Sequence, residues 1–98
     1  MKFIVSIKQS TNGTLIIITD NDLLGKKFEQ GKLQLDLTKK FYQGEEKNEN
    51  EVKEILKKAD HLHLTGEVSV AIGIELNLIE SRKIVWIAGI PHAEMVLG

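Results

Sequence analysis

Residues 2–19 read KFIVSIKQSTNGTLIIIT and contain two β-rich runs, residues 2–8 and 14–19. Asn12-Gly13 lies between the runs, and an Asn-Gly pair in that setting is a strong short-range signal for a β-hairpin. The second run is apolar at consecutive positions, which is typical of a strand covered on both faces. The sequence therefore predicts an antiparallel hairpin whose second strand lies at the centre of a sheet.

Two further stretches have the pattern of strands. Residues 32–37 alternate polar and apolar side chains, so Leu33, Leu35 and Leu37 should point toward the core. Residues 83–88 include the most apolar strand-like run of the chain and should form the last strand.

The first of two predicted helices has apolar residues at the spacing i, i+3, i+4 and i+7, which defines one buried stripe. The members of this stripe are Val52, Ile55, Leu56 and Ala59. Residues 43–50 should form a polar loop before the helix, and Asn48 or Asn50 can cap its first turn.

The second helix should begin after Thr65, whose side chain is of a type that caps helices. Its helical spacing continues toward Asn77 through Val68, Ala71, Ile72 and Glu75. The alternation of residues 61–64 predicts a short strand before the cap. Residues 20–28 predict only one helical turn followed by a loop, because Gly25 disfavours a long helix.

Strands are concentrated early in this order of elements and helices late. Such an order favours the α+β class, here a single two-layer domain over residues 1–98. We expect a mostly antiparallel sheet with two main helices packed on it. A chain of 98 residues buries enough surface for one core.

The composition excludes several kinds of site and partner. The chain has no cysteine, so disulfides, thiolate metal sites and thiol nucleophiles are excluded. Its formal net charge is −1, which gives no overall attraction to nucleic acid or to anionic membranes. The apolar run at residues 1–5 is far too short for a signal peptide or a membrane span. We therefore expect a cytoplasmic protein without a membrane partner.

Lys26 and Lys27 form a basic corner, but they do not belong to a P-loop, because the required glycine and Ser/Thr are missing around them. The two lysines form either a solvated corner or a contact to phosphate, for example in RNA. Tyr42 follows Phe41 and a pair of lysines. Its ring either packs in the core or stacks on a base.

His92 is the strongest polar candidate of the sequence. The only proline of the chain, Pro91, precedes it, and Gly89 permits an unusual turn, so the segment should form a turn that aims the imidazole. If the segment were extended, His92 and Glu94 would share one face, and the carboxylate could orient a general base. No nucleophile with a legible partner accompanies them, which favours a structural role.

Two other features have weaker functional interpretations. His61 and His63 would share one strand face and could begin a zinc site, but zinc takes three or four ligands. Asp60 and His92 would complete the set only if folding brought them together, so we predict no metal site and no cofactor. Gly66 lies at a predicted helix N-terminus, which attracts anions, although capping alone explains it.

Five blocks of sequence together carry a resemblance to a known family. They are Asp22-Leu23-Leu24-Gly25-Lys26, Gly31-x-Leu33, Phe41-Tyr42-x-Gly44-Glu45, Leu64-x-Gly66-Glu67 and Gly89-Ile90-Pro91-His92-Ala93. In this order and spacing they resemble a small, mainly archaeal family catalogued as domain of unknown function 424, over nearly the whole chain. Glu94 departs from the glutamine that is common in the family. His63-Leu64-Thr65 departs from its usual asparagine and valine.

The resemblance implies a stand-alone two-layer α+β protein without established enzymatic chemistry. The archaeal gene setting of the family implies a link to translation, through initiation factor two or ribosomal RNA or protein. We therefore expect a non-enzymatic accessory binding protein. The residues expected to bind are Lys26, Lys27, Tyr42, Glu45, Gly66, Pro91, His92 and Glu94.

Two alternatives stay open. One is a small enzyme that uses His92 as general acid or base and Lys26 as an anion anchor. The other is a homo-oligomeric structural module whose apolar strands pair across subunits. The sequence does not decide the oligomeric state.

Overall fold

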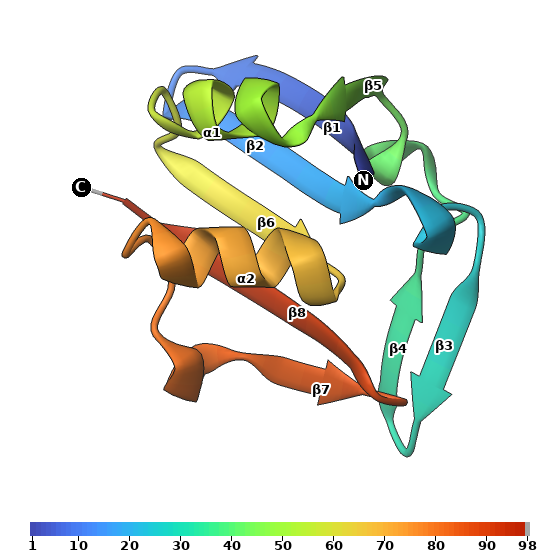
Figure 1. The fold of residues 1–98 in the computed structure, drawn as a ribbon. Helices are drawn as coiled ribbons and strands as arrows, with labels where there is room; N and C mark the ends of the chain where they lie inside the picture. The colour runs from blue at the N-terminus through green and yellow to red at the C-terminus, as the bar shows by residue number, and fades with distance from the viewer. Residues whose placement is uncertain (98) are drawn as a thin grey trace.

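The computed structural model describes residues 1–97, in which a six-stranded sheet carries two α-helices on one face (Figure 1). Its strands lie in the order β5-β1-β2-β6-β8-β7. Their bounds are Lys2–Ser10 (β1), Gly13–Asp20 (β2), Glu45–Asn48 (β5), His61–Thr65 (β6), Val85–Ile87 (β7) and Ile90–Val96 (β8). All neighbours are antiparallel except β2 and β6, so the predicted α+β class with a mostly antiparallel sheet is confirmed.

The remaining elements are short. A second, two-stranded sheet pairs β3 (Lys27–Gln30) with β4 (Leu33–Asp36). The helices are α1 (Glu49–Leu56) and α2 (Glu67–Glu75). Three single turns of 3₁₀-helix complete the fold: η1 (Asn21–Leu23), η2 (Lys40–Tyr42) and η3 (Ser81–Lys83). No helix within residues 1–97 has the length and apolar character that spanning a bilayer requires.

The predicted hairpin forms as expected, with β1 and β2 paired from Phe3 and Asp20 to Ser10 and Gly13. Ile16 and Ile18 face the helices in the main core, whereas Ile17 points to the opposite face. All three side chains are at most 1% exposed. The prediction that this strand is central and covered on both faces is therefore confirmed.

The first helix also follows the sequence pattern. Val52 and Leu56 are buried against the sheet, and Ile55 and Ala59 pack at the edge of the same cluster. Asn48 is the cap, because its side chain accepts from the N–H of Glu51, whose carboxylate accepts in turn from the N–H of Asn48. This reciprocal pair is a capping box.

The start of α2 corrects the prediction that Thr65 is the cap. Gly66 holds the cap position with φ of 108°, and the capping oxygens come from Asp20 at the end of β2. The Asp20 carboxylate accepts from the N–H of Val68 at 3.0 Å and from the N–H and hydroxyl of Ser69 at 2.8 and 2.6 Å. A Cβ on Gly66 would collide with the Asp20 side chain, so glycine is required there.

Of the four residues whose helical spacing predicts α2, Ile72 is buried and Val68 is partly buried against the main core. The buried residues are Ser69, Val70, Ile72 and Gly73, whereas Ala71 and Glu75 are exposed. The helix ends at Glu75 rather than Asn77, which has a positive φ of 60°. Because α2 is apolar on most of its circumference, its periodicity does not define the buried face.

Three segments form strands that the sequence did not suggest. Strand β3 begins inside the loop predicted for residues 20–28 and pairs with β4. The predicted polar loop contains β5, whose charged residues pair by backbone with the edge of β1. The predicted final turn around Pro91 is strand β8, and the last predicted strand shortens to β7. The turn instead lies at Ala88-Gly89, whose φ values of 50° and 81° are both positive, as a type I′ hairpin turn requires.

A smaller core lies where the β3–β4 hairpin meets the turn between β7 and β8 (Figure 1). Leu35 and Leu37 are buried there, together with Leu23 and Ile87. Leu33 is 47% exposed, so its predicted inward position is wrong. Leu33 pairs with Gln30 beside the hairpin turn, and the Gln30 side chain accepts from the N–H of Ala88. The alternation of polar and apolar residues therefore predicts the buried positions of Leu35 and Leu37 correctly, but it extends one position beyond the core, to Leu33.

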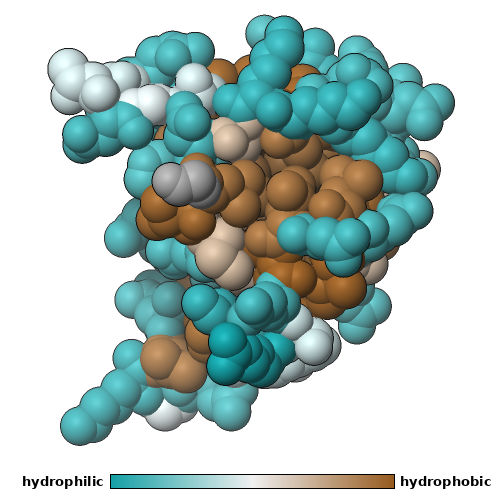
Figure 2. Space-filling model, turned by 90° about the vertical axis from the view of Figure 1, so that its left-hand side faces the viewer, coloured by the Kyte–Doolittle hydropathy of each residue, from teal (hydrophilic) through white to brown (hydrophobic). Residues whose placement is uncertain are grey.

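Some apolar surface stays uncovered on the helix side. Figure 2 shows hydrophobic side chains, coloured brown, gathered at the heights at which Figure 1 places α1 and α2. A groove of about 390 Å³ lies here, lined by Leu56, Leu76 and Leu78 between lysines 53 and 57. Nothing within residues 1–97 fills it.

The caps of the two helices lead to a stability prediction. Replacing Asp20 by alanine removes three hydrogen bonds to a buried carboxylate, and we expect a loss of about 3 kcal/mol in the free energy of unfolding. Asn48→Ala, which removes an exposed cap, should cost only about 1 kcal/mol. Urea unfolding of both variants measures the difference. Equal losses would contradict the role assigned to Asp20.

Candidate functional site

A row of polar residues lies on the sheet face opposite the helices. It comes from the paired strands β6 and β8, where His63 is the register partner of Glu94 and Thr65 that of His92. Alternate residues of a strand point to the same face, so all four side chains project together. The prediction that His92 and Glu94 share a face in an extended segment is confirmed.

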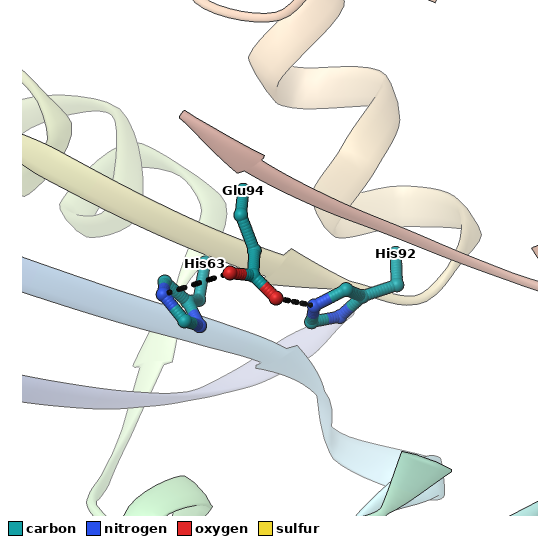
Figure 3. Close-up of side chains that lie close together, drawn as sticks. All are labelled: His63, His92 and Glu94. Carbon is teal, nitrogen blue, oxygen red and sulfur yellow. Dashed lines mark hydrogen bonds and ion pairs between the residues drawn. The ribbon is translucent and has the colours of Figure 1, made fainter. Parts of the chain in front are cut away.

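Two hydrogen bonds and one contact between His63 and Glu94 join these side chains, and we call the three titratable residues the His63–His92–Glu94 cluster (Figure 3). Glu94 lies between the two rings and turns one carboxylate oxygen to each. Oε2 is 2.8 Å from Nε2 of His92, and Oε1 is 3.5 Å from Nε2 of His63. The Oγ1 atom of Thr65 lies 2.8 Å from Nδ1 of His92. Both nitrogens of the His92 ring are therefore engaged.

Burial differs within the cluster. Thr65 is fully buried and His92 is 8% exposed, while His63 is partly exposed and Glu94 is exposed. The buried Thr65 thus holds the inner residue of the cluster, His92, while solvent reaches the outer residue, Glu94. An approaching ion or small molecule would meet Glu94 first.

Aromatic residues of η2 form a wall beside the cluster. The ring centroid of Phe41 is 5.2 Å from that of His63, in an edge-to-face arrangement. Tyr42 lies 5.1 Å from Phe41, also edge to face, and packs against the smaller core. The Nζ of Lys8 lies 5.6 Å from the Phe41 ring centroid, within the range of a cation–π contact. This wall holds the His63 ring in place.

The surroundings shift the proton affinity of three groups. Burial lowers the pKa of His63 despite the opposing influence of Glu94. The hydrogen bond from His92 lowers the pKa of Glu94, with a further contribution from His63. Burial, and next the charge of Glu94, raises the pKa of Tyr42. At neutral pH the cluster therefore presents an ionised carboxylate beside a neutral His63 imidazole, a set that accepts a proton or a cation.

Thr19 lies next to this cluster on the neighbouring strand β2. It is the register partner of Thr65, and both side chains are fully buried. The hydroxyl of Thr19 has no hydrogen-bond partner among residues 1–97. Buried polar atoms without partners are uncommon and carry a desolvation cost.

The eight residues predicted to bind do not form one site. His92 and Glu94 are in contact, and Tyr42 lies close enough for the charge of Glu94 to act on it. Pro91 points to the opposite face of β8, where it lines a hollow with residues of α2. Gly66 serves as the α2 cap.

The three remaining charged candidates lie elsewhere. Lys26 is exposed beside β3, Lys27 pairs with Glu29 at 3.7 Å, and Glu45 pairs with Lys47 at 3.3 Å. Within residues 1–97 no hydrogen bond or ion pair joins Lys26 to His92. The general acid or base and the anion anchor that the enzyme alternative requires, His92 and Lys26, are therefore not in contact.

The sequence indicates His63 only together with His61, as the start of a zinc site, and Thr65 only as a helix cap, so it does not predict their contact with His92 and Glu94. The alternation of residues 61–64 put His63 on a definite face, but only long-range pairing with β8 puts that face beside His92. His61 pairs with Val96 at the other end of the two strands. The zinc set weighed from the sequence, with His61 and Asp60, is thus replaced by a different set.

Comparison with known proteins gives a family and a fold. A family model described as "Protein of unknown function (DUF424)" matches residues 7–97. The structure is similar to the crystal structure of an uncharacterized conserved protein from Methanopyrus kandleri, with a TM-score of 0.80 and 17% sequence identity. The similarity covers 100% of this chain and 95% of the other. No curated protein matches the sequence. At this identity the structural likeness shows the fold alone.

The two buried threonines give a matched test of the cluster. Thr65→Val leaves Nδ1 of the buried His92 ring without a partner, which should cost about 1–3 kcal/mol in the free energy of unfolding. Thr19→Val removes a hydroxyl that has no partner and should be neutral or stabilising. Urea unfolding at neutral pH measures both. Equal destabilisation by the two substitutions would contradict the Thr65–His92 hydrogen bond.

Proposed function

The chain belongs to the DUF424 family, and we propose that it is a non-enzymatic accessory binding protein that docks an extended segment of a protein partner along the free edge of β7. The observation that carries this proposal is the contrast between the two edges of the large sheet. One edge is charged, and the other is apolar and exposed.

Sheet edges expose unpaired backbone groups, and proteins usually protect them with charged residues. The β5 edge follows this rule with Glu45, Glu46 and Lys47. The β7 edge does not, because Val85 is 45% and Trp86 is 53% exposed. An unprotected apolar edge is a template for pairing with another strand.

Trp86 also borders an apolar hollow of about 190 Å³ on the helix side of the sheet. Ile74, Ile84 and Pro91 contribute to its walls, and Glu67 to its rim. Tryptophan is enriched among the residues that contribute most to binding energy at interfaces. The hollow therefore suits one large apolar side chain of a partner, packed against the indole ring.

The proposed occupant is an extended segment rather than a rigid second copy. β7 has only three residues, so ladder hydrogen bonds alone would be few with any partner, and a side chain placed in the hollow must add to them. An extended segment can pair with β7 and also place a side chain in the hollow beside Trp86. Main-chain bonds then provide affinity and the hollow provides selectivity.

Translation is the proposed setting, with initiation factor two or a ribosomal protein as the partner. The gene setting that the family resemblance implies motivates this proposal, and the similar structure from Methanopyrus kandleri is consistent with an archaeal family. The cytoplasm is the corresponding proposed location.

Co-purification tests this proposal. The tagged protein is incubated with extract of the source organism at low and moderate salt, and bound proteins are identified. Initiation factor two or ribosomal proteins should be enriched, and Trp86→Ala should reduce their recovery at least about tenfold through loss of the indole contact. Glu46→Ala, on the opposite edge, should leave recovery unchanged. Absence of translation components would exclude the setting, and unchanged binding by Trp86→Ala would exclude the edge.

Light scattering at high protein concentration tests the second copy as the occupant. We expect a monomer. A dimer that Trp86→Ala dissociates would assign the β7 edge to self-association and overturn the proposal. Circular dichroism of the variant confirms that the exposed substitution leaves the fold intact.

A further inference from the structure

The donor atoms of the His63–His92–Glu94 cluster are arranged as a metal site would require. One ring nitrogen of His63, one ring nitrogen of His92 and one carboxylate oxygen of Glu94 all lie within 4.8 Å of one another. Ligands that bind zinc at 2.0–2.2 Å in tetrahedral geometry are separated by about 3.3 Å. Side-chain shifts of about 1 Å from the observed arrangement would reach that spacing.

We propose that His63, His92 and Glu94 bind one divalent transition-metal ion, with zinc as the best-suited member of this class. Two imidazoles and one carboxylate are a donor set of zinc sites and of other first-row divalent metals. Such a three-residue site leaves a fourth position for water or an incoming ligand. The exposed side of Glu94 gives the ion a direct path from solvent.

The hydrogen bond between Thr65 and His92 fits this role. A metal on Nε2 requires the ring proton on Nδ1, which then donates to Oγ1 of Thr65. Without a metal, Nε2–H donates to Glu94 and Nδ1 accepts from the Thr65 hydroxyl. A hydroxyl both donates and accepts, so the ring changes tautomer without losing a partner. The metal takes the place of the proton between His92 and Glu94.

The fold also fixes the ligands before the ion arrives. Two ligands are register partners on adjacent strands, His63 on β6 and Glu94 on β8. His92 is buried, and the Phe41 ring restrains His63. Ligands on paired strands are held more precisely than ligands on loops. The exposed Glu94 is the ligand with the most freedom to adjust.

The proposed metal site is separate from the proposed docking edge. His92 faces the cluster, whereas its neighbour Pro91 faces the hollow beside Trp86. The Trp86→Ala variant should therefore bind metal like the wild-type protein. A negative result for the metal site therefore does not contradict the docking proposal, and the reverse also holds.

Calorimetric titration of the metal-free protein with Zn²⁺ tests the site. We expect one ion per chain, and His63→Ala and Glu94→Ala should each weaken binding about 100-fold or more, because a direct ligand is worth at least as much as its supporting hydrogen bond. His61→Ala is the matched control, since His61 lies on the same strand and face outside the cluster, and it should not change binding. Thr65→Val should weaken binding about 10–100-fold.

Co²⁺ provides a spectroscopic check, because tetrahedral nitrogen and oxygen ligation gives visible absorption bands that the His63→Ala variant should lose. Replacing the buried His92 would affect folding as well as metal binding. The test therefore relies on variants of the more exposed ligands, His63 and Glu94. The proposal is overturned if the wild-type chain shows no saturable binding. It is equally overturned if His61→Ala weakens binding as much as His63→Ala does.

Discussion

The parallel pairing of β2 with β6 is the constraint on which the rest of the structure depends. Parallel neighbours need a long crossover, which residues 21–60 supply through the β3–β4 hairpin, β5 and α1. Two aspartates hold the pair at its ends. Asp60 exchanges backbone and side-chain hydrogen bonds with Thr14 at the start. Asp20 binds the first turn of α2 directly after the end of β6.

Register at this pair decides where the polar cluster lies. A slip of one residue would turn His63 and Thr65 into the helix-covered core and bring Leu62 and Leu64 to the opposite face. Both aspartate contacts would be lost in that register, so the fold is strongly biased against it. The cluster is therefore a consequence of the core packing on the other side of the same strands. Its cost is visible at Thr19, whose buried hydroxyl has no partner among residues 1–97.

Local signals predicted the elements that are stabilised locally. Asn12-Gly13 and the apolar stripe of α1 depend on near neighbours, and both predictions are confirmed. The strand β5 pairs with the distant β1, and β8 pairs with the distant β6 as well as with its hairpin partner β7. β5 has no apolar alternation to reveal it, and Pro91 in β8 suggested a turn. Its position is compatible with a strand, because pairing of β8 with β6 begins only at His92.

The residues of the candidate site also differ in whether local sequence or long-range pairing determines their positions. Alternation correctly gave the shared face of His92 and Glu94, because that relation lies within one strand. It could not give His63 or Thr65, because their proximity arises from pairing between β6 and β8.

Adjacent residues of β8 point to opposite faces of the sheet. This alternation explains why one short segment contributes to both the hollow beside Trp86 and the polar cluster. Gly89 completes the type I′ turn, Pro91 lines the hollow beside Trp86, and His92 joins the polar cluster. A strand delivers side chains to both faces without a change in backbone path. The two surfaces thus share one rigid element but no side chain. A ligand bound at the hollow or at the polar cluster contacts the same strand, β8. A substitution at one of these surfaces leaves the side chains of the other unchanged.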